Sequence, residues 1–428
     1  MKKFLHPKPA EWAKILERPT QSFEAIEPVV REVFEKVNKE GDKALLSYTL
    51  KFDGAELLDL RVAKEELQKA INSVPEPLKH AIETAQNNIT KFHAAQNTQK
   101  VSVETMPGVQ CWQEKRPIQK VGLYIPGGTA PLFSTILMLA IPAHLAGCEE
   151  IILCSPPNEK GKLDPVILFT AQLCGVTKIF KIGGIQAIAG MTFGTETIPK
   201  VYKIFGPGNQ YVTVAKQWAT KMGVAIDMPA GPSELLVVAD NTANPAFVAS
   251  DLLSQAEHGV DSQVLLVSTS EQLLKKVELE IEAQLKVLPR KEIAQQAIAH
   301  SRMILVKDDR MALEIINEYG PEHYIVCVAN EDFFIQNTIN AGSVFIGNYT
   351  PESVGDYASG TNHTLPTNGY AKQYSGVNLD SFRKSMTFQK LSREGIQNIG
   401  KSVELMAEAE GLQAHKNAVT LRLKELDN

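Results

Sequence analysis

The sequence predicts an α/β fold with two doubly wound parallel-sheet domains, a short N-terminal arm and a helical C-terminal segment. Two observations predict this class. Short apolar runs alternate with helical patterns over about 110 residues in the middle of the chain, and a second alternation of the same kind follows. Strands that alternate with helices favour parallel sheets, because a helix is the usual crossover between two parallel strands.

The first alternation begins near Lys120. Its strands are expected at residues 121–125, 151–154, 178–182 and 200–205. A helical pattern follows each strand, from residue 133, at 166–173, through residue 187 and at 211–221. Three of the four strands lead directly into a glycine-rich turn: Pro126-Gly127-Gly128, Gly183-Gly184 and Gly206-Pro207-Gly208-Asn209.

These three turns are candidate nucleotide-binding turns. Ligands bind at the carboxyl ends of the strands in an open parallel sheet, and helix N-termini suit phosphates. None of the three turns has the G-x-G-x-x-G pattern, so each domain is expected to be an incomplete Rossmann-like unit. The alternative for each turn is a tight connection without a ligand.

The second alternation predicts strands at 235–239, 264–267, 303–306, 325–328 and 343–346. Helical patterns are expected at 22–50 and 64–92, and a short strand pair at 101–117. The predicted division of the chain is an N-terminal arm (1–21), a main α/β domain (22–123 with 233–377), a second α/β domain with the candidate nucleotide-binding turns (124–232) and a helical C-terminal segment (378–428).

Composition narrows the class of protein. The chain has 428 residues, 44% of them hydrophobic, and a net charge of -5. We expect no nucleic-acid partner, because there is no basic stripe, and no membrane span, because no apolar run is long enough. The five cysteines are scattered and the first residues lack the pattern of a signal peptide, so a cytoplasmic protein with reduced cysteines is expected.

The segment Ser254-Gln255-Ala256-Glu257-His258-Gly259 is the first candidate site. It follows a helical run, so Gln255 and His258 are expected on one face of a helix that Gly259 ends. An imidazole beside an amide could hold a metal ion or a polar substrate. A capped surface helix with a solvated histidine is the alternative.

Two further segments could complete such a site. Glu322-His323 precedes a buried strand, and a histidine beside a carboxylate is typical of a general base; a capping glutamate and a core histidine are the alternative. The irregular segment 347–367 contains Asp356 and His363, which could supply an oxygen and a nitrogen ligand. With Gln255 and His258 they would form a site without thiolates, which suits catalytic zinc or manganese.

Taken together, these segments resemble the histidinol dehydrogenase family. The matching stretches run in the family's order from about residue 20 to the C-terminus: Gly206 to Tyr211 with Lys216, Asp227 to Glu234, Ser254 to Gly259, Gly320 to Tyr324, Gly347 to Thr367 and Glu410 to His415.

The resemblance implies that the protein oxidises L-histidinol to L-histidine through L-histidinaldehyde, using two NAD⁺ and one zinc ion per subunit. It implies that Glu322 and His323 are catalytic, and that Tyr124, Gln186 and Asn209 contact NAD. The implied zinc ligands are Gln255, His258, Asp356 and His415. The implied substrate contacts are Ser233, Gln255, His258, His323, Asp356, His363, Glu410 and His415.

Family members are intertwined homodimers, so the resemblance also implies that the segment with Glu410 and His415 completes the site of the partner subunit. In the implied reaction His323 would deprotonate the alcohol and Glu322 would activate the water that attacks the aldehyde. Three alternatives stay open: a zinc hydrolase, which would need no NAD; a non-catalytic nucleotide-binding protein on the same scaffold; and a dehydrogenase for another amino alcohol.

Overall fold

The computed structural model describes residues 1–19, 25–127, 131–229 and 231–426. They form two compact units. The first unit contains residues 1–96 and 118–382, and the second contains residues 97–117 and 383–428. The first unit holds two parallel sheets, so the predicted α/β class with parallel sheets is confirmed.

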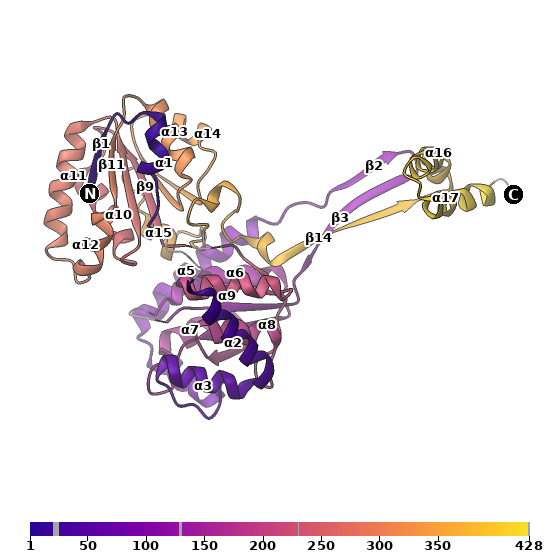
Figure 1. The fold of residues 1–428 in the computed structure, drawn as a ribbon, viewed down its shortest axis with the longest axis horizontal. Coiled ribbons are helices and arrows are strands. Elements are labelled where there is room, and N and C mark those ends of the chain that lie inside the picture. Colours follow the sequence, from indigo (N-terminus) through magenta and orange to yellow (C-terminus); the bar gives the residue numbers. More distant parts are fainter. Residues whose placement is uncertain (20–24, 128–130, 230, 427–428) are drawn as a thin grey trace. The chain divides into compact units, whose positions relative to one another are not determined.

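The six-stranded sheet has the order β1-β11-β10-β9-β12-β13, and every pairing in it is parallel (Figure 1). Its strands are β1 (Lys2–Leu5), β9 (Glu234–Ala239), β10 (Gln263–Ser268), β11 (Arg302–Leu305), β12 (His323–Cys327) and β13 (Ser343–Ile346). Alternate residues of a strand point to opposite faces. Leu235 and Val237 therefore pack in one core and Leu236 and Val238 in another.

Helices cover both faces of this sheet, as a doubly wound fold requires. One core includes residues of α10 (Pro245–Ala256), α11 (Glu271–Leu285) and α12 (Lys291–Ala299). The other core includes residues of α1 (Pro9–Ile15), α13 (Asp309–Tyr319) and α14 (Glu331–Asn337).

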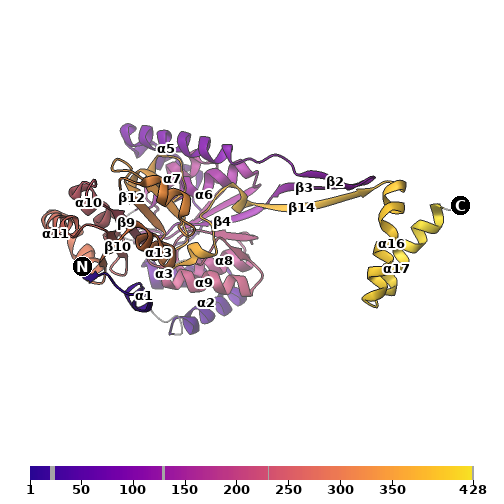
Figure 2. The ribbon, with the colours of Figure 1, turned by 90° about the horizontal axis from the view of Figure 1, so that it is seen from above.

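The five-stranded sheet, whose strand β4 is labelled in Figure 2, has the order β6-β5-β4-β7-β8 and is also parallel throughout. Its strands are β4 (Lys120–Tyr124), β5 (Glu150–Ser155), β6 (Lys178–Lys181), β7 (Lys203–Phe205) and β8 (Ala225–Ile226). The helices between them are α6 (Phe133–Ala146), α7 (Pro165–Leu173), α8 (Gly184–Phe193) and α9 (Gln210–Lys221).

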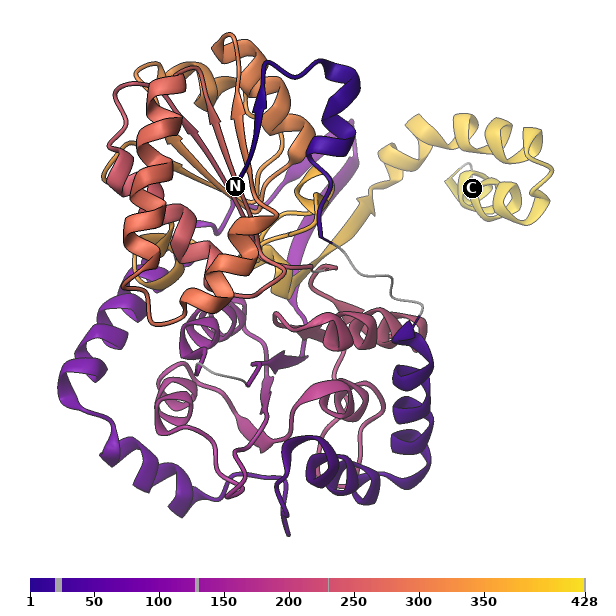
Figure 3. The same cartoon turned by 60° about the vertical axis from the view of Figure 1, so that its left-hand side comes forward.

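The N-terminal helices pack on this five-stranded sheet, whereas the predicted boundaries placed them with the other one. They are α2 (Glu27–Glu40), α3 (Asp42–Asp53), α4 (Lys64–Ser73) and α5 (Glu76–Ala95). The buried stripe of α2, which includes Val30 and Val33, shares a core with α8 and α9. Figure 3 shows these helices in indigo and purple on the two sides of the sheet. A helical pattern shows that one face is apolar, but it does not show which sheet covers that face.

The predicted N-terminal arm (1–21) contains a strand and a helix. Lys2 to Leu5 pair in register with Arg302 to Leu305, so β1 forms an edge of the six-stranded sheet.

The second unit is a three-stranded antiparallel sheet followed by two helices. Its sheet has the order β14-β3-β2, from β2 (Ser102–Met106), β3 (Val109–Pro117) and β14 (Arg383–Leu391). The predicted strand pair at 101–117 is confirmed. The helices are α16 (Arg393–Ala409) and α17 (Gln413–Leu426). Among the described residues, none of the helices combines the length and apolarity that crossing a bilayer needs.

The predicted helical segment at 378–428 begins instead with the strand β14, and its helices start only at Arg393. This strand pairs along its whole length with β3, and Phe388 stacks on Trp112 with ring centroids 5.3 Å apart. Local sequence did not predict the strand, because most of its side chains are exposed and its partner lies more than 250 positions earlier.

Candidate functional site

A cavity of about 210 Å³ in the first unit brings together most of the predicted site residues. The turns after β7 and β8 form one wall, at the carboxyl ends of strands of the five-stranded sheet. The starts of β9 and β12 form another wall, so the six-stranded sheet contributes through the amino ends of its strands. The predicted residues that line the cavity are Ser233, Gln255, His258, Glu322, His323, Asp356 and His363.

An imidazole with two carboxylates lies at the centre of the cavity. His323 Nε2 is 3.2 Å from Asp356 Oδ1, and His323 Nδ1 is 3.7 Å from Glu322 Oε2. Glu322 Oε2 also accepts a hydrogen bond of 2.8 Å from the backbone N–H of Glu234. The first residue of β12 and the residue before it therefore form one buried carboxylate–imidazole pair.

Burial and charge act in opposite directions on these groups. Burial alone would lower the pKa of His323, but the carboxylates of Glu352, Glu322 and Asp356 raise it well above its usual range. Burial raises the pKa of Glu322 to about 8, although the charge of His323 opposes this. Burial would also raise the pKa of Asp356, but its hydrogen bond and ion pair with His323 lower it. Groups with such perturbed pKa values cluster at active sites.

A group of possible metal ligands lies beside this pair. Ligand atoms of His258, Glu352 and Asp356 all lie within 4.8 Å of one another. Glu352 and Asp356 are one turn apart on the short helix α15 (Glu352–Tyr357). The sequence analysis missed Glu352; the available signal was a second carboxylate four positions before Asp356, which places both on one helix face.

Gln255 and His258 reach the cavity in a different way from the predicted one. Helix α10 ends at Ala256, so Gln255 lies in its last turn and His258 in the turn that follows. The backbone N–H of His258 donates to the carbonyl of Gln255 at 3.3 Å. Gly259 is not the glycine that ends the helix, because Glu257 occupies the cap position.

The surroundings of Gln255 determine how its amide is oriented. Both ends of the amide find partners only if its nitrogen faces Glu352 Oε1 and its oxygen faces the backbone N–H of Glu234, which then donates to it at 3.1 Å. Its side chain is fully buried, whereas His258 is exposed.

His363 is held on the other side of the cavity. Its Nδ1 lies 2.8 Å from the carbonyl oxygen of Asp356, and its Nε2 lies 3.1 Å from Thr135 Oγ1. Burial lowers the pKa of His363, which favours the neutral imidazole. The other two predicted residues, Glu410 and His415, belong to the second unit, where both are exposed at the junction of α16 and α17.

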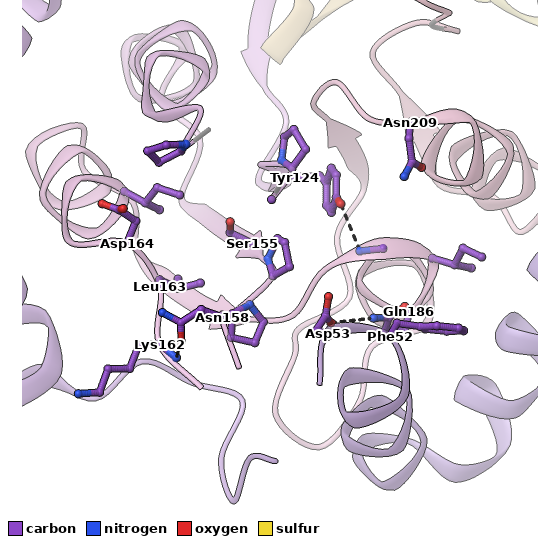
Figure 4. A pocket seen from close by; sticks show the side chains of 18 of the residues that line it. Phe52, Asp53, Tyr124, Ser155, Asn158, Lys162, Leu163, Asp164, Gln186 and Asn209 are labelled. Atoms are coloured by element: carbon purple, nitrogen blue, oxygen red, sulfur yellow. Dashed lines mark hydrogen bonds between the residues drawn. The ribbon is translucent and has the colours of Figure 1, made fainter. Parts of the chain in front are cut away.

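A larger cavity of about 930 Å³ contains all three predicted NAD contacts (Figure 4). The backbone N–H of Gly184, at the start of α8, donates to the hydroxyl of Tyr124 at 3.2 Å. Asn209 caps α9 by accepting hydrogen bonds from the backbone N–H groups of Tyr211 and Val212. Two helix N-termini therefore face a cavity at the carboxyl ends of parallel strands, which is the usual place for a nucleotide in an open sheet.

Asp53 also lines this cavity, and the sequence analysis missed it. Gln186 Nε2 donates to Asp53 Oδ2 at 3.4 Å (Figure 4). Burial raises the pKa of Asp53 to about 6. No motif indicated this residue, because it comes from α3, about 70 positions before the strand that carries Tyr124.

A buried ion pair supports the turn between the two cavities. Lys216 Nζ lies 2.5 Å from Asp227 Oδ1, and the same nitrogen donates to the carbonyl of Gly206 at 2.8 Å. Asp227 Oδ2 accepts the backbone N–H of Gly206 at 2.8 Å. The N–H and the carbonyl of Gly206 are therefore both hydrogen-bonded to this ion pair. In the same turn, Gly208 lines the smaller cavity and Asn209 lines the larger one.

Two doubly wound sheets, a nucleotide-sized cavity and an adjoining acid–base centre define an α/β enzyme. Comparison with known proteins then specifies the family. The sequence model of the family described as histidinol dehydrogenase matches residues 16–423. A histidinol dehydrogenase of Bacteroides thetaiotaomicron is 58% identical, with both chains covered completely, and one of Campylobacter jejuni is 53% identical over 96% of each chain.

A solved structure agrees with these sequence relatives. The crystal structure of histidinol dehydrogenase from Elizabethkingia anophelis superimposes with a TM-score of 0.98 at 57% identity, covering 100% of this chain and 99% of that one. The chain belongs to the histidinol dehydrogenase family and is an oxidoreductase. The resemblance found in the sequence is confirmed.

Proposed function

We propose that this protein oxidises L-histidinol to L-histidine through L-histidinaldehyde, reducing two NAD⁺ per substrate at a zinc-dependent site shared between two subunits. The observation that carries the proposal is that Gln255, His258 and Asp356 line the same cavity as the Glu322–His323 pair. These residues come from three separate stretches of chain, and an accidental meeting of so many ligand-type and acid–base side chains is rare on a folded surface.

The residues present suit a divalent cation. Glu322 and Asp356 line the cavity, and close to Asp356 the Oε2 atom of Glu352 is buried with no hydrogen-bond partner among the described residues. A buried carboxylate without a partner is costly, and a cation offsets that cost. Gln255, His258 and Asp356 supply an amide, an imidazole and a carboxylate, a donor set without thiolate that suits catalytic zinc. When bound, zinc would act as a Lewis acid that anchors the substrate's nitrogens.

We place NAD⁺ in the larger cavity, where it would accept the hydride at each of the two oxidation steps. Tyr124, Gln186 and Asn209 are the proposed contacts. The N-termini of α8 and α9 favour the pyrophosphate at the cavity wall.

The chain's own residues would handle the protons. His323 takes the proton of the alcohol in the first oxidation and of the hydrated aldehyde in the second. Glu322 takes a proton from the water that adds to the aldehyde. His363 and Ser233, on the wall of the same cavity, would orient the substrate.

The fourth zinc ligand in this proposal is the partner subunit's His415, and the partner subunit's Glu410 would contact the substrate. Two observations support a dimer with shared sites. His258 is exposed, so the ligand group is open on one side. In the second unit, large apolar side chains are exposed on α16 (Met406), on α17 (Leu421) and in the turn between them (Leu412), and such a surface is typical of an interface.

The deciding experiment measures absorbance in the NADH band with histidinol, with and without a chelator. Two NADH formed per histidinol, lost with the chelator and restored by Zn²⁺, is the expected result. Turnover without NAD⁺ would favour a hydrolase, and one NADH per substrate would favour a simple alcohol dehydrogenase. His323→Ala should lower turnover by about 10²–10⁴, the range for a lost general base.

Shared sites have a separate test. His415→Ala and His258→Ala subunits, each inactive alone, should regain part of the activity when they are mixed and allowed to exchange. In such a heterodimer, one of the two sites receives neither substitution. No recovery in a mixture shown to contain heterodimers would mean that each site is built within one chain.

A further inference from the structure

The larger cavity contains a carboxylate that the proposed reaction does not use. Asp53 is the last residue of α3, and Gln186 Nε2 donates to its Oδ2 at 3.4 Å. Among the described residues this half-buried carboxylate has no other hydrogen-bond partner and forms no ion pair. Burial raises its pKa to about 6, so the group is ionised at pH 8. A ligand that brings further O–H groups would offset the cost of burying this charge.

Two other polar atoms of the same cavity are also unpaired. Ser155 Oγ and Gln186 Oε1 have no hydrogen-bond partner among the described residues, and both side chains are 1% exposed. Both residues line the cavity together with Asp53. In Figure 4 a carboxylate oxygen of Asp53 points into the space between Ser155 and Tyr124. These groups around one part of the cavity indicate a ligand with several hydroxyl groups.

The strand order indicates which half of a dinucleotide this part of the cavity would hold. The turn after β7 borders both cavities, through Gly208 and Asn209, so the nicotinamide that must reach the acid–base pair belongs at this turn. Ser155 ends β5, which β4 separates from β7. Neither β5 nor α3 contributes a described residue to the smaller cavity. The sugar beside Asp53 is therefore the ribose of the adenosine half.

Asp53 takes the place of an acid that dinucleotide-binding sheets usually carry elsewhere. Such sheets bind this ribose through an Asp or Glu about 20 residues after the glycine-rich turn, at the end of the second strand. The second strand of this sheet in chain order is β5, and it ends in the neutral Ser155. Asp53 supplies a carboxylate from a helix that precedes the sheet. Its two oxygens match the two adjacent hydroxyls of a ribose, and hydrogen bonds to a charged acceptor are strong.

The same carboxylate opposes a phosphate on the 2′-oxygen. Like charges in contact repel each other, and more strongly in a partly buried site than in water. Sites that accept the 2′-phosphate place an arginine beside it. Lys162 is the only cation among the described residues that line this cavity, and Figure 4 shows its ammonium pointing away from Asp53.

We propose that Asp53 is a specificity-determining residue that binds the 2′- and 3′-hydroxyls of the adenosine ribose and thereby selects NAD⁺ against NADP⁺. This inference rests on the proposed NAD⁺ site in the larger cavity.

The test measures dissociation constants of the full-length protein at pH 8 by isothermal titration calorimetry. The probes are NAD⁺ and its analogue without the adenosine 2′-hydroxyl. The wild type should bind the analogue about 10–100-fold more weakly, the range for a lost hydrogen bond to a charged group. Asp53→Ala should bind both within about threefold, because the acceptor is gone. Equal affinities in the wild type, or an undiminished preference in Asp53→Ala, would overturn the inference.

NADP⁺ gives a second comparison. The wild type should bind it at least about 100-fold more weakly than NAD⁺, because the 2′-phosphate brings negative charge against Asp53. Asp53→Asn keeps the shape of the side chain and removes the charge, so it should narrow this ratio at least about 10-fold. An unchanged ratio would show that another group excludes the phosphate and would overturn the inference.

Asp164 provides the matched control. It lines the same cavity, but its carboxylate caps α7 by accepting the backbone N–H of Val166 at 2.9 Å. Asp164→Asn removes the same charge and keeps a good capping residue. It should change the ratio of the NADP⁺ and NAD⁺ affinities by less than about threefold. A change as large as that of Asp53→Asn would assign the effect to net charge and overturn the inference.

The outcomes separate this inference from the proposed function. If the wild type binds none of the three nucleotides, the proposed NAD⁺ site fails. If it binds NAD⁺ and the Asp53 variants show wild-type preferences, only the role of Asp53 is overturned. If Asp53→Ala does not fold, as judged by far-UV circular dichroism, the wild-type comparison and Asp53→Asn still decide the question.

Discussion

Replacing Lys216 with methionine should destabilise the first unit by about 3–5 kcal/mol, the cost of leaving a buried charge without its partner. The side chains of Lys216 and Asp227 are 3% and 1% exposed, so water cannot replace the lost ammonium. The carbonyl of Gly206 would lose a donor as well. Methionine has a similar length, so lost packing contributes little.

The assay is urea unfolding followed by far-UV circular dichroism, with Lys216→Met, Asp227→Asn and the double variant compared. Because the double variant removes both charges, it should recover at least half of the loss caused by Lys216→Met. The NAD⁺ KM of Lys216→Met should also rise, because the pair holds the turn that leads to Asn209. Destabilisation below about 1 kcal/mol, or strictly additive losses, would show that the pair is not energetically coupled and refute the reasoning.

Three further outcomes are expected. Gly206→Ala should abolish NAD⁺ binding in isothermal titration calorimetry, because Gly206 has a φ of +131° and a Cβ there would lie 2.0 Å from the carbonyl oxygen of Tyr124; wild-type affinity would contradict this. Burial raises the pKa of Asp251 from 3.8 to about 7, so the folded protein binds more protons than the unfolded chain between these values and loses stability as pH rises through them. Because of Asp251, the free energy of unfolding of the wild type should fall by on the order of 4 kcal/mol between pH 4 and 8, and Asp251→Asn should remove this fall. Parallel curves of unfolding free energy against pH for the two proteins would contradict this prediction. The rate of aldehyde oxidation should increase with pH and level off above an apparent pKa near 8, the pKa of Glu322. Glu322→Gln should slow this step more than it slows oxidation of the alcohol. An unchanged pH profile in that variant would show that Glu322 does not activate the water.

Local patterns were enough to predict the two parallel sheets. Buried parallel strands are short apolar runs, and the helices between them are long enough to show a helical period, so both signals are strong in a single sequence. The Glu322–His323 pair could be predicted for a similar reason, since two adjacent residues before a strand remain close in any fold. By contrast, β14 is mostly exposed, and only its pairing with β3 makes it a strand.

Side chains that act through distant partners were not predictable in this way. Asp53 lies in the larger cavity because α3 packs beside α8, and Glu352 meets Gln255 because α15 lies against α10. Neither contact has a sequence spacing that could indicate it. The N-terminal helices illustrate the same point, because an apolar stripe shows that one helix face is buried but does not specify which of the two sheets covers it.

The sequence by itself determined the alternation of strands and helices, the glycine turns after the strands and the kinds of side chain available for acid–base and metal chemistry. These properties depend on neighbouring residues and on the periods of helix and strand. Only the tertiary structure decided which sheet each helix covers, that Glu352 lies beside the amide of Gln255, and that Lys216 and Asp227 hold the turn between the two cavities. Those contacts join residues from separate elements, and their energies depend on burial, which exists only in the folded chain.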